Sequence, residues 1–114
     1  MKRKIKLYIG DIIENIKLAE KIIKDIDYSM FIADKTKNYA VVRCIEIIGE
    51  AVKNIPEDVR LKYPSVPWKD MAGMRDVVIR FYMGVDFKIV WDVVIKRYPV
   101  LLPTIEKIYN ELED

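Results

Sequence analysis

The feature that most constrains the fold of this chain is a spacing of apolar residues by three and four positions. In the first segment these residues are Ile5, Ile9, Ile12, Ile16, Ala19, Ile23 and Ile26. A helix brings such positions onto one face over about six turns, and the charged residues of this segment fall on the opposite face. The spacing therefore predicts a long amphipathic helix that buries one side.

A second helix is predicted from Thr36 to Asn54, with two neighbouring apolar rows instead of one. Burial over half of its circumference follows, so this segment is the expected central helix. Gly49 lies inside it and costs about 1 kcal/mol relative to alanine. Such a glycine typically allows another helix to approach closely. The two rows are Ala40, Cys44, Ile47 and Ala51, and Val41, Ile45, Ile48 and Val52.

Proline, glycine and capping residues divide the rest of the chain. We expect a turn over 30–33 capped by Ser29, a helix over 56–63, a helix over 68–82 with a bend at Gly73, and a turn over 83–85. Asp86 is predicted to cap a helix over 87–98, and Pro99 and Pro103 to break and restart the chain before a last helix ending near Leu112. With no strand alternation, the prediction is one domain over 1–114, an all-α up-and-down bundle of about five helices.

Composition excludes several classes of function. The chain has 114 residues, a net charge of +2 and no histidine. Zinc sites and Ser–His or Cys–His nucleophile pairs are therefore not expected, and no glycine-rich phosphate loop indicates a cofactor. The small net charge means that any contact with RNA needs a local patch. Cys44 is alone and apolar in its surroundings, which predicts a buried thiol and a cytoplasmic protein; no signal peptide or membrane segment is expected.

The residues that could carry chemistry lie in the stretch 74–86. Seven residues separate Arg75 from Tyr82, which places them nearly in line on a helix. Asp76 and Arg80 are four apart, in the orientation that favours an ion pair. Spacing alone leaves an ordinary amphipathic helix open, with Arg75 solvated, Arg80 paired with Asp76, and Val77, Val78 and Phe81 buried. Glu46 and Glu50 are likewise interpreted as a solvated helix face.

Sequence blocks along almost the whole chain resemble HepT, the ribonuclease toxin branch of the HEPN superfamily. The resemblance begins at Tyr8-Ile9-Gly10-Asp11-Ile12-Ile13 and Ala40-Val41-Val42-Arg43. It continues through Glu46-Ile47-Ile48-Gly49-Glu50-Ala51 and Tyr63-Pro64-Ser65-Val66-Pro67-Trp68. It ends with Met74-Arg75-Asp76 and Tyr82-Met83-Gly84-Val85-Asp86-Phe87-Lys88-Ile89-Val90-Trp91. The resemblance implies a HEPN-like helical bundle.

The resemblance also implies a site and partners. The family motif is arginine, four residues, histidine, one residue, tyrosine; Arg75 and Tyr82 match it, and Asp76 matches the polar residue that usually follows the arginine. The implied protein is a homodimer whose motif helices face one cleft and cleave RNA without a metal or cofactor. Its implied partner is an MntA-type nucleotidyltransferase antitoxin, which adds AMP to the tyrosine, here Tyr82.

Arg80 stands where this motif has its histidine. Cleavage of RNA without a metal needs a group that takes a proton from the 2′-hydroxyl, and histidine titrates near neutral pH. Arginine stays protonated and cannot act as that base, although it can bind a phosphate. Two interpretations follow: a ribonuclease toxin weakened by this replacement, or a catalytically inactive module that binds RNA and a partner and accepts AMP.

Overall fold

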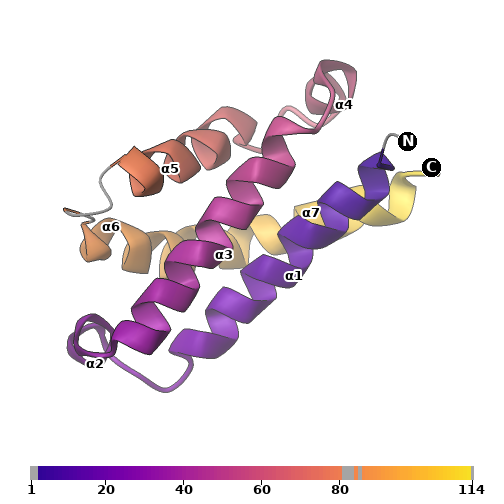
Figure 1. The fold of residues 1–114 in the computed structure, drawn as a ribbon. Helices are drawn as coiled ribbons and strands as arrows, with labels where there is room; N and C mark the ends of the chain where they lie inside the picture. The colour runs from indigo at the N-terminus through magenta and orange to yellow at the C-terminus, as the bar shows by residue number, and fades with distance from the viewer. Residues whose placement is uncertain (1–2, 81–83, 85, 114) are drawn as a thin grey trace.

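The structure is a computed structural model that describes residues 3–80, 84 and 86–113, apart from the side chains of Ile79 and Arg80. Over these ranges the chain is helical, without a strand, as Figure 1 shows. The predicted all-α bundle is therefore confirmed. In order, its elements are α1 (Ile5–Ile23), α2 (Tyr28–Ala33), α3 (Lys35–Lys53), α4 (Glu57–Lys62), α5 (Trp68–Arg80), α6 (Phe87–Asp92), a π-helical turn (Val93–Arg97) and α7 (Tyr98–Glu111).

The central helix is α3, as predicted from its two apolar rows. It packs extensively against α1 and against α5, and α7 packs against α1 (Figure 1). One apolar row is almost fully buried, whereas Ala40 and Ile47 in the other row are only half-buried. The largest fully buried aliphatic side chains of the core are Ile9, Ile12, Ile16, Val41, Ile45, Ile48, Val52, Val90, Val94, Ile105 and Ile108.

Aspartates start three of the helices. The side chain of Asp27 accepts a hydrogen bond from the Met30 amide at 2.8 Å, so α2 begins at Tyr28 and the predicted cap at Ser29 is wrong. Asp34 caps α3 in the same way. Asp86 accepts a hydrogen bond from the Lys88 amide at 2.9 Å and confirms the predicted cap of α6. An aspartate oxygen satisfies an amide of the first turn that has no partner within the helix.

The prediction that Pro99 and Pro103 break the chain is wrong. Helix α6, the π-helical turn and α7 follow one another without interruption, and Pro103 lies inside α7. A proline removes one amide and its ring presses on the carbonyl four residues earlier. The wider π-helical turn ends two residues before Pro99 and contains the carbonyl of Ile95, four residues before that proline, so the ring fits without a break. Apolar packing of Ile105 and Ile108 into the core offsets what the prolines cost.

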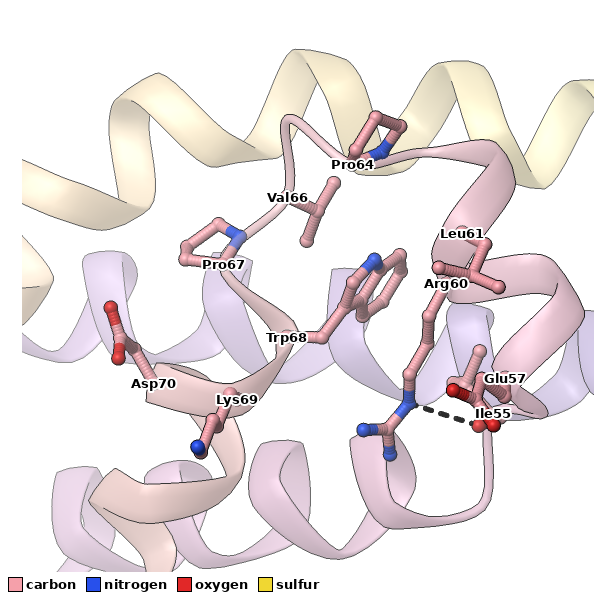
Figure 2. Close-up of a pocket in the computed structure, with 10 residues that line it drawn as sticks. All are labelled: Ile55, Glu57, Arg60, Leu61, Pro64, Val66, Pro67, Trp68, Lys69 and Asp70. Atoms are coloured by element: carbon pink, nitrogen blue, oxygen red, sulfur yellow. Dashed lines mark hydrogen bonds between the residues drawn. The ribbon is translucent and has the colours of Figure 1, made fainter.

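Hydrogen bonds at the end of α3 determine where α5 begins. Arg60 of α4 donates through Nε to the Ile55 carbonyl at 3.0 Å and through Nη2 to the Val52 carbonyl at 2.6 Å. Figure 2 shows this arginine beside Trp68, the first residue of α5. The Trp68 indole donates to the Tyr63 carbonyl at 3.1 Å. The first two bonds tie α4 to the end of α3, and the third ties the start of α5 to the residue that follows α4.

Candidate active site at the crossing of α3 and α5

The two helices meet at Gly49 and Arg75 with almost no space between them. A Cβ atom built on Gly49 would lie 2.1 Å from Cβ of Arg75 and 3.3 Å from its Cα. Real atoms do not approach so closely, so this crossing requires glycine at 49. The close approach that Gly49 predicted is confirmed, and its neighbour is the arginine that the sequence singled out.

Six charged side chains surround this crossing, and we call them the α3/α5 seam: Arg43, Glu46, Glu50 and Lys53 from α3, and Arg75 and Asp76 from α5. They form consecutive ion pairs from Arg43 through Glu50, Arg75 and Asp76 to Lys53. Glu46 and Glu50 thus lie on a face that is open to solvent, as interpreted from the sequence, and both are ion-paired there with arginines. All six side chains keep some exposure to solvent.

Arg75 is held on the surface of α3. Its Nη1 donates to Oδ1 of Asp76 at 3.3 Å, and its Nη2 lies 3.7 Å from Oε1 of Glu50. The side chain is only 27% exposed, and its Nε is buried with no acceptor among the described residues. The alternative of a solvated Arg75 is therefore wrong. The same alternative predicted that Val77 and Val78 are buried. Val77 is 43% exposed, so the prediction is wrong there, whereas Val78 is buried as predicted.

Asp76 is the most strongly paired acid of the seam. Nζ of Lys53 donates to its Oδ1 at 2.7 Å. This hydrogen bond holds the pKa of Asp76 below its ordinary value; partial burial opposes the effect, and the bond from Arg75 adds to it. The carboxylate is thus ionised at neutral pH and is a poor proton acceptor. Its partners among the described side chains are Lys53 and Arg75, whereas the predicted pair with Arg80 involves a side chain outside the described residues.

Of the predicted site residues, Arg80 is described only in part and Tyr82 is not described. Arg80 is the last residue of α5, and its side chain lies outside the described residues. Tyr82 lies wholly outside them. The structure thus brings together Arg75 and Asp76 of the predicted set. It adds Lys53, which the sequence analysis missed, and Glu50, which was interpreted only as part of a solvated helix face; both stand within one helical turn of Gly49.

Cys44 has no part in this chemistry. Its side chain is 2% exposed in the core beneath α3, and burial raises the pKa of its thiol. A buried thiol of raised pKa is a poor nucleophile. The predicted structural role is confirmed.

Together, the fold and the seam define a small all-α protein with a guanidinium held at a helix crossing, where it can bind an anion. The family model described as "Ribonuclease HepT-like" matches residues 12–108. This chain belongs to the HepT-like ribonuclease family, within which its HEPN-like bundle fits.

Relatives with ribonuclease names share this sequence over nearly its full length. A protein of Methanocaldococcus jannaschii, provisionally named an RNase, is 46% identical over 99% of this chain and 97% of its own. "Probable ribonuclease HepT" of Thermococcus cleftensis is 44% identical over 95% of this chain and 98% of its own. A Caldanaerobacter subterraneus protein with a provisional RNase name is 40% identical over 91% and 93%. No solved structure matches.

None of the described helices is long and apolar enough to cross a membrane.

Proposed function

We propose that this chain is the ribonuclease toxin of a toxin–antitoxin pair, an endoribonuclease that works without a metal and is weakened by arginine at position 80. Its substrate is RNA. The observation that supports the proposal is Arg75, which matches the motif arginine that the resemblance implies and which lies against Gly49 at the α3/α5 crossing, 3.7 Å from Glu50.

The proposed reaction is an attack of the RNA 2′-oxygen on the adjacent phosphorus, with breakage of the bond to the 5′-oxygen. The 2′-hydroxyl loses its proton to a base, and the leaving 5′-oxygen gains one. Arg75 supplies fixed positive charge beside the phosphate as negative charge develops. Arg80 adds charge but cannot take the proton, since its guanidinium stays protonated.

Restoring a titratable group tests this account. Arg80→His is expected to raise RNA cleavage at neutral pH by at least about tenfold, because acid–base help typically contributes 10²–10⁴ in rate. The double variant Arg80→His with Arg75→Gln is expected to lose that gain. The measurement is the rate at which each purified variant cleaves a labelled RNA, compared with the rate in a mock-treated sample. If the unaltered chain cuts RNA well and Arg80→His gives no gain, the proposal that the chain lacks a catalytic base is contradicted.

The absence of histidine from the chain favours a second candidate, a catalytically inactive module that binds RNA and a partner. In both cases we propose an MntA-type nucleotidyltransferase as partner and Tyr82 as the residue that receives AMP. The added phosphate would place negative charge near the arginines of the site. Intact mass after incubation with ATP, magnesium and the transferase tests this, and AMP adducts that persist in Tyr82→Phe would refute it.

We also propose that the chain works as a homodimer in the cytoplasm. In support of the dimer, Val77 of α5 and Ile89 of α6 are both more than 40% exposed and line one groove. Exposed apolar patches commonly mark an interface. Light scattering that finds a 13.5 kDa particle at micromolar concentration would exclude the dimer. Recovery of the native protein outside the cytoplasmic fraction would exclude the location.

A further inference from the structure

One carboxylate oxygen of the seam lies between two arginines from different helices. Oε1 of Glu50 is 3.7 Å from Nη1 of Arg43 and also 3.7 Å from Nη2 of Arg75. The two guanidinium nitrogens are therefore no more than twice that distance apart. Two charge-assisted hydrogen bonds of about 2.8 Å, one on each side of a single phosphate, suit such a separation.

We propose that Arg43 and Arg75 together bind one backbone phosphate of single-stranded RNA, and that Glu50 occupies the place of that phosphate in the free protein. This inference rests on the proposed ribonuclease function, to which it adds a second phosphate-binding arginine and an internal competitor. Arg43 belongs to α3, so the RNA backbone would lie across the crossing rather than along α5 alone.

The contacts of Glu50 are of a kind that a phosphate can replace. Both distances exceed those of a hydrogen bond, and the Glu50 side chain is 44% exposed. Ion pairs in such exposed positions contribute little to stability, because water and salt screen them. A phosphate offers more acceptor oxygens and shorter contacts to both guanidinium groups.

Each arginine has donor capacity left in the present arrangement. Arg43 is 59% exposed, and its closest acid, Glu46, lies one turn along the same helix at 3.3 Å. Arg75 has its Nε buried without an acceptor among the described residues. A buried donor without a partner is unfavourable. A small shift of the Arg75 side chain toward a bound phosphate would relieve this, which favours exchange of Glu50 for RNA.

An ordinary surface network of ion pairs is the competing explanation, and the two differ at Glu50. If Glu50 competes with RNA, removing its charge frees two arginines and tightens binding. If these ion pairs have no role in RNA binding, Glu50→Gln changes the RNA affinity only as much as the loss of any other negative charge does. Glu106 provides the matched control, since it pairs with Lys17 at 3.6 Å on the α1/α7 side of the molecule.

The experiment measures anisotropy of a labelled, 2′-O-methylated RNA oligonucleotide, which cannot be cleaved, over a range of salt concentrations. Arg43→Gln and Arg75→Gln are each expected to weaken binding, and the double variant is expected to reduce the salt slope by about 0.7, the value for one phosphate of a single strand. Arg3→Gln is the matched control, an arginine paired with Asp11 at 2.6 Å beside α1. Glu50→Gln should tighten binding several-fold, and Glu106→Gln should not.

The two-arginine site is overturned if Arg43→Gln and Arg3→Gln bind RNA with equal affinity while Arg75→Gln binds it more weakly. So does equal binding by Glu50→Gln and Glu106→Gln. Cleavage of unmodified RNA is measured in parallel on the unaltered chain. If that chain cuts RNA while Arg43→Gln binds normally, only this inference fails. If the chain neither binds nor cuts RNA, the proposed function fails with it. Thermal unfolding of each variant verifies that it is folded.

Discussion

Two glycines of this bundle face a side chain of a neighbouring helix, and they do different things. Gly49 of α3 lies against Arg75, and a Cβ there would meet that residue at 2.1 Å. Gly10 of α1 lies against Tyr109 of α7, and a Cβ there would meet the ring at 3.5 Å, an ordinary contact. The first glycine is a condition of the helix crossing, whereas the second leaves room for a methyl group.

The surroundings of the two contacts differ as well. Charged side chains of α3 and α5 pair with one another across the crossing at Gly49, whereas the ion pair described beside the hollow at Gly10 joins Lys17 and Glu106. Charge beside a close crossing costs stability unless the charges are paired. The α3/α5 crossing thus brings Arg75 into ion pairs with both helices, whereas the α1/α7 contact at Gly10 is an ordinary packing contact.

The largest expected effect is the difference in unfolding free energy between two single variants, Gly49→Ala and Gly10→Ala. Gly49→Ala gains about 1 kcal/mol in helix propensity but forces α5 away from α3, and overpacking of this kind costs more than it gains. We expect a net loss of about 3 kcal/mol in unfolding free energy. Gly10→Ala should be neutral or stabilise by up to about 1 kcal/mol. Urea denaturation measures both, and equal losses would remove the distinction between the two contacts.

A smaller effect distinguishes the two faces of α5. Val78 is 2% exposed, and Val78→Ala is expected to cost about 1.5 kcal/mol through lost apolar contact and a small cavity. Val77 is its matched control, 43% exposed in the monomer, and Val77→Ala should cost less than about 0.5 kcal/mol. The two variants are compared by denaturation at low protein concentration. If Val77→Ala loses more unfolding free energy than Val78→Ala, then the face of α5 that carries Val77, and not the face that carries Val78, packs on α3.

The smallest effect concerns acid pH at the seam. The pKa of Asp76 is lowered in the folded chain, mainly by the hydrogen bond from Lys53. A lowered pKa gives a stabilisation that is present above the unfolded value of about 3.9 and is lost as pH falls through the folded pKa. Lys53→Ala should therefore raise the pKa of Asp76 toward its ordinary value, and Lys107→Ala, on α7, should not. Carbon NMR of the carboxyl group against pH detects the shift; no shift in Lys53→Ala would remove Lys53 as its cause.

Local signals in the sequence determined most of the fold. Apolar spacing predicted α1 and α3 to within a few residues, since it depends only on helix geometry. Local signals failed where tertiary packing outweighed a local preference. The prolines at 99 and 103 stay within the helical rod because that rod buries Ile105 and Ile108, and packing offsets a local cost. The cap at Asp27 was missed in favour of Ser29, although aspartate is an equally good capping residue.

The site divides in the same way between sequence and tertiary structure. The sequence by itself singled out Arg75, Arg80 and Tyr82 through a family motif, and Gly49 as a point of close approach. Only the tertiary structure paired Arg75 with Glu50 and Asp76 with Lys53, each pair joined across more than twenty residues. Periodicity describes one helix at a time, so it determines which faces are buried but not which two faces meet. The meeting of α3 and α5 depends on their shapes at Gly49, and those shapes exist only in the folded chain.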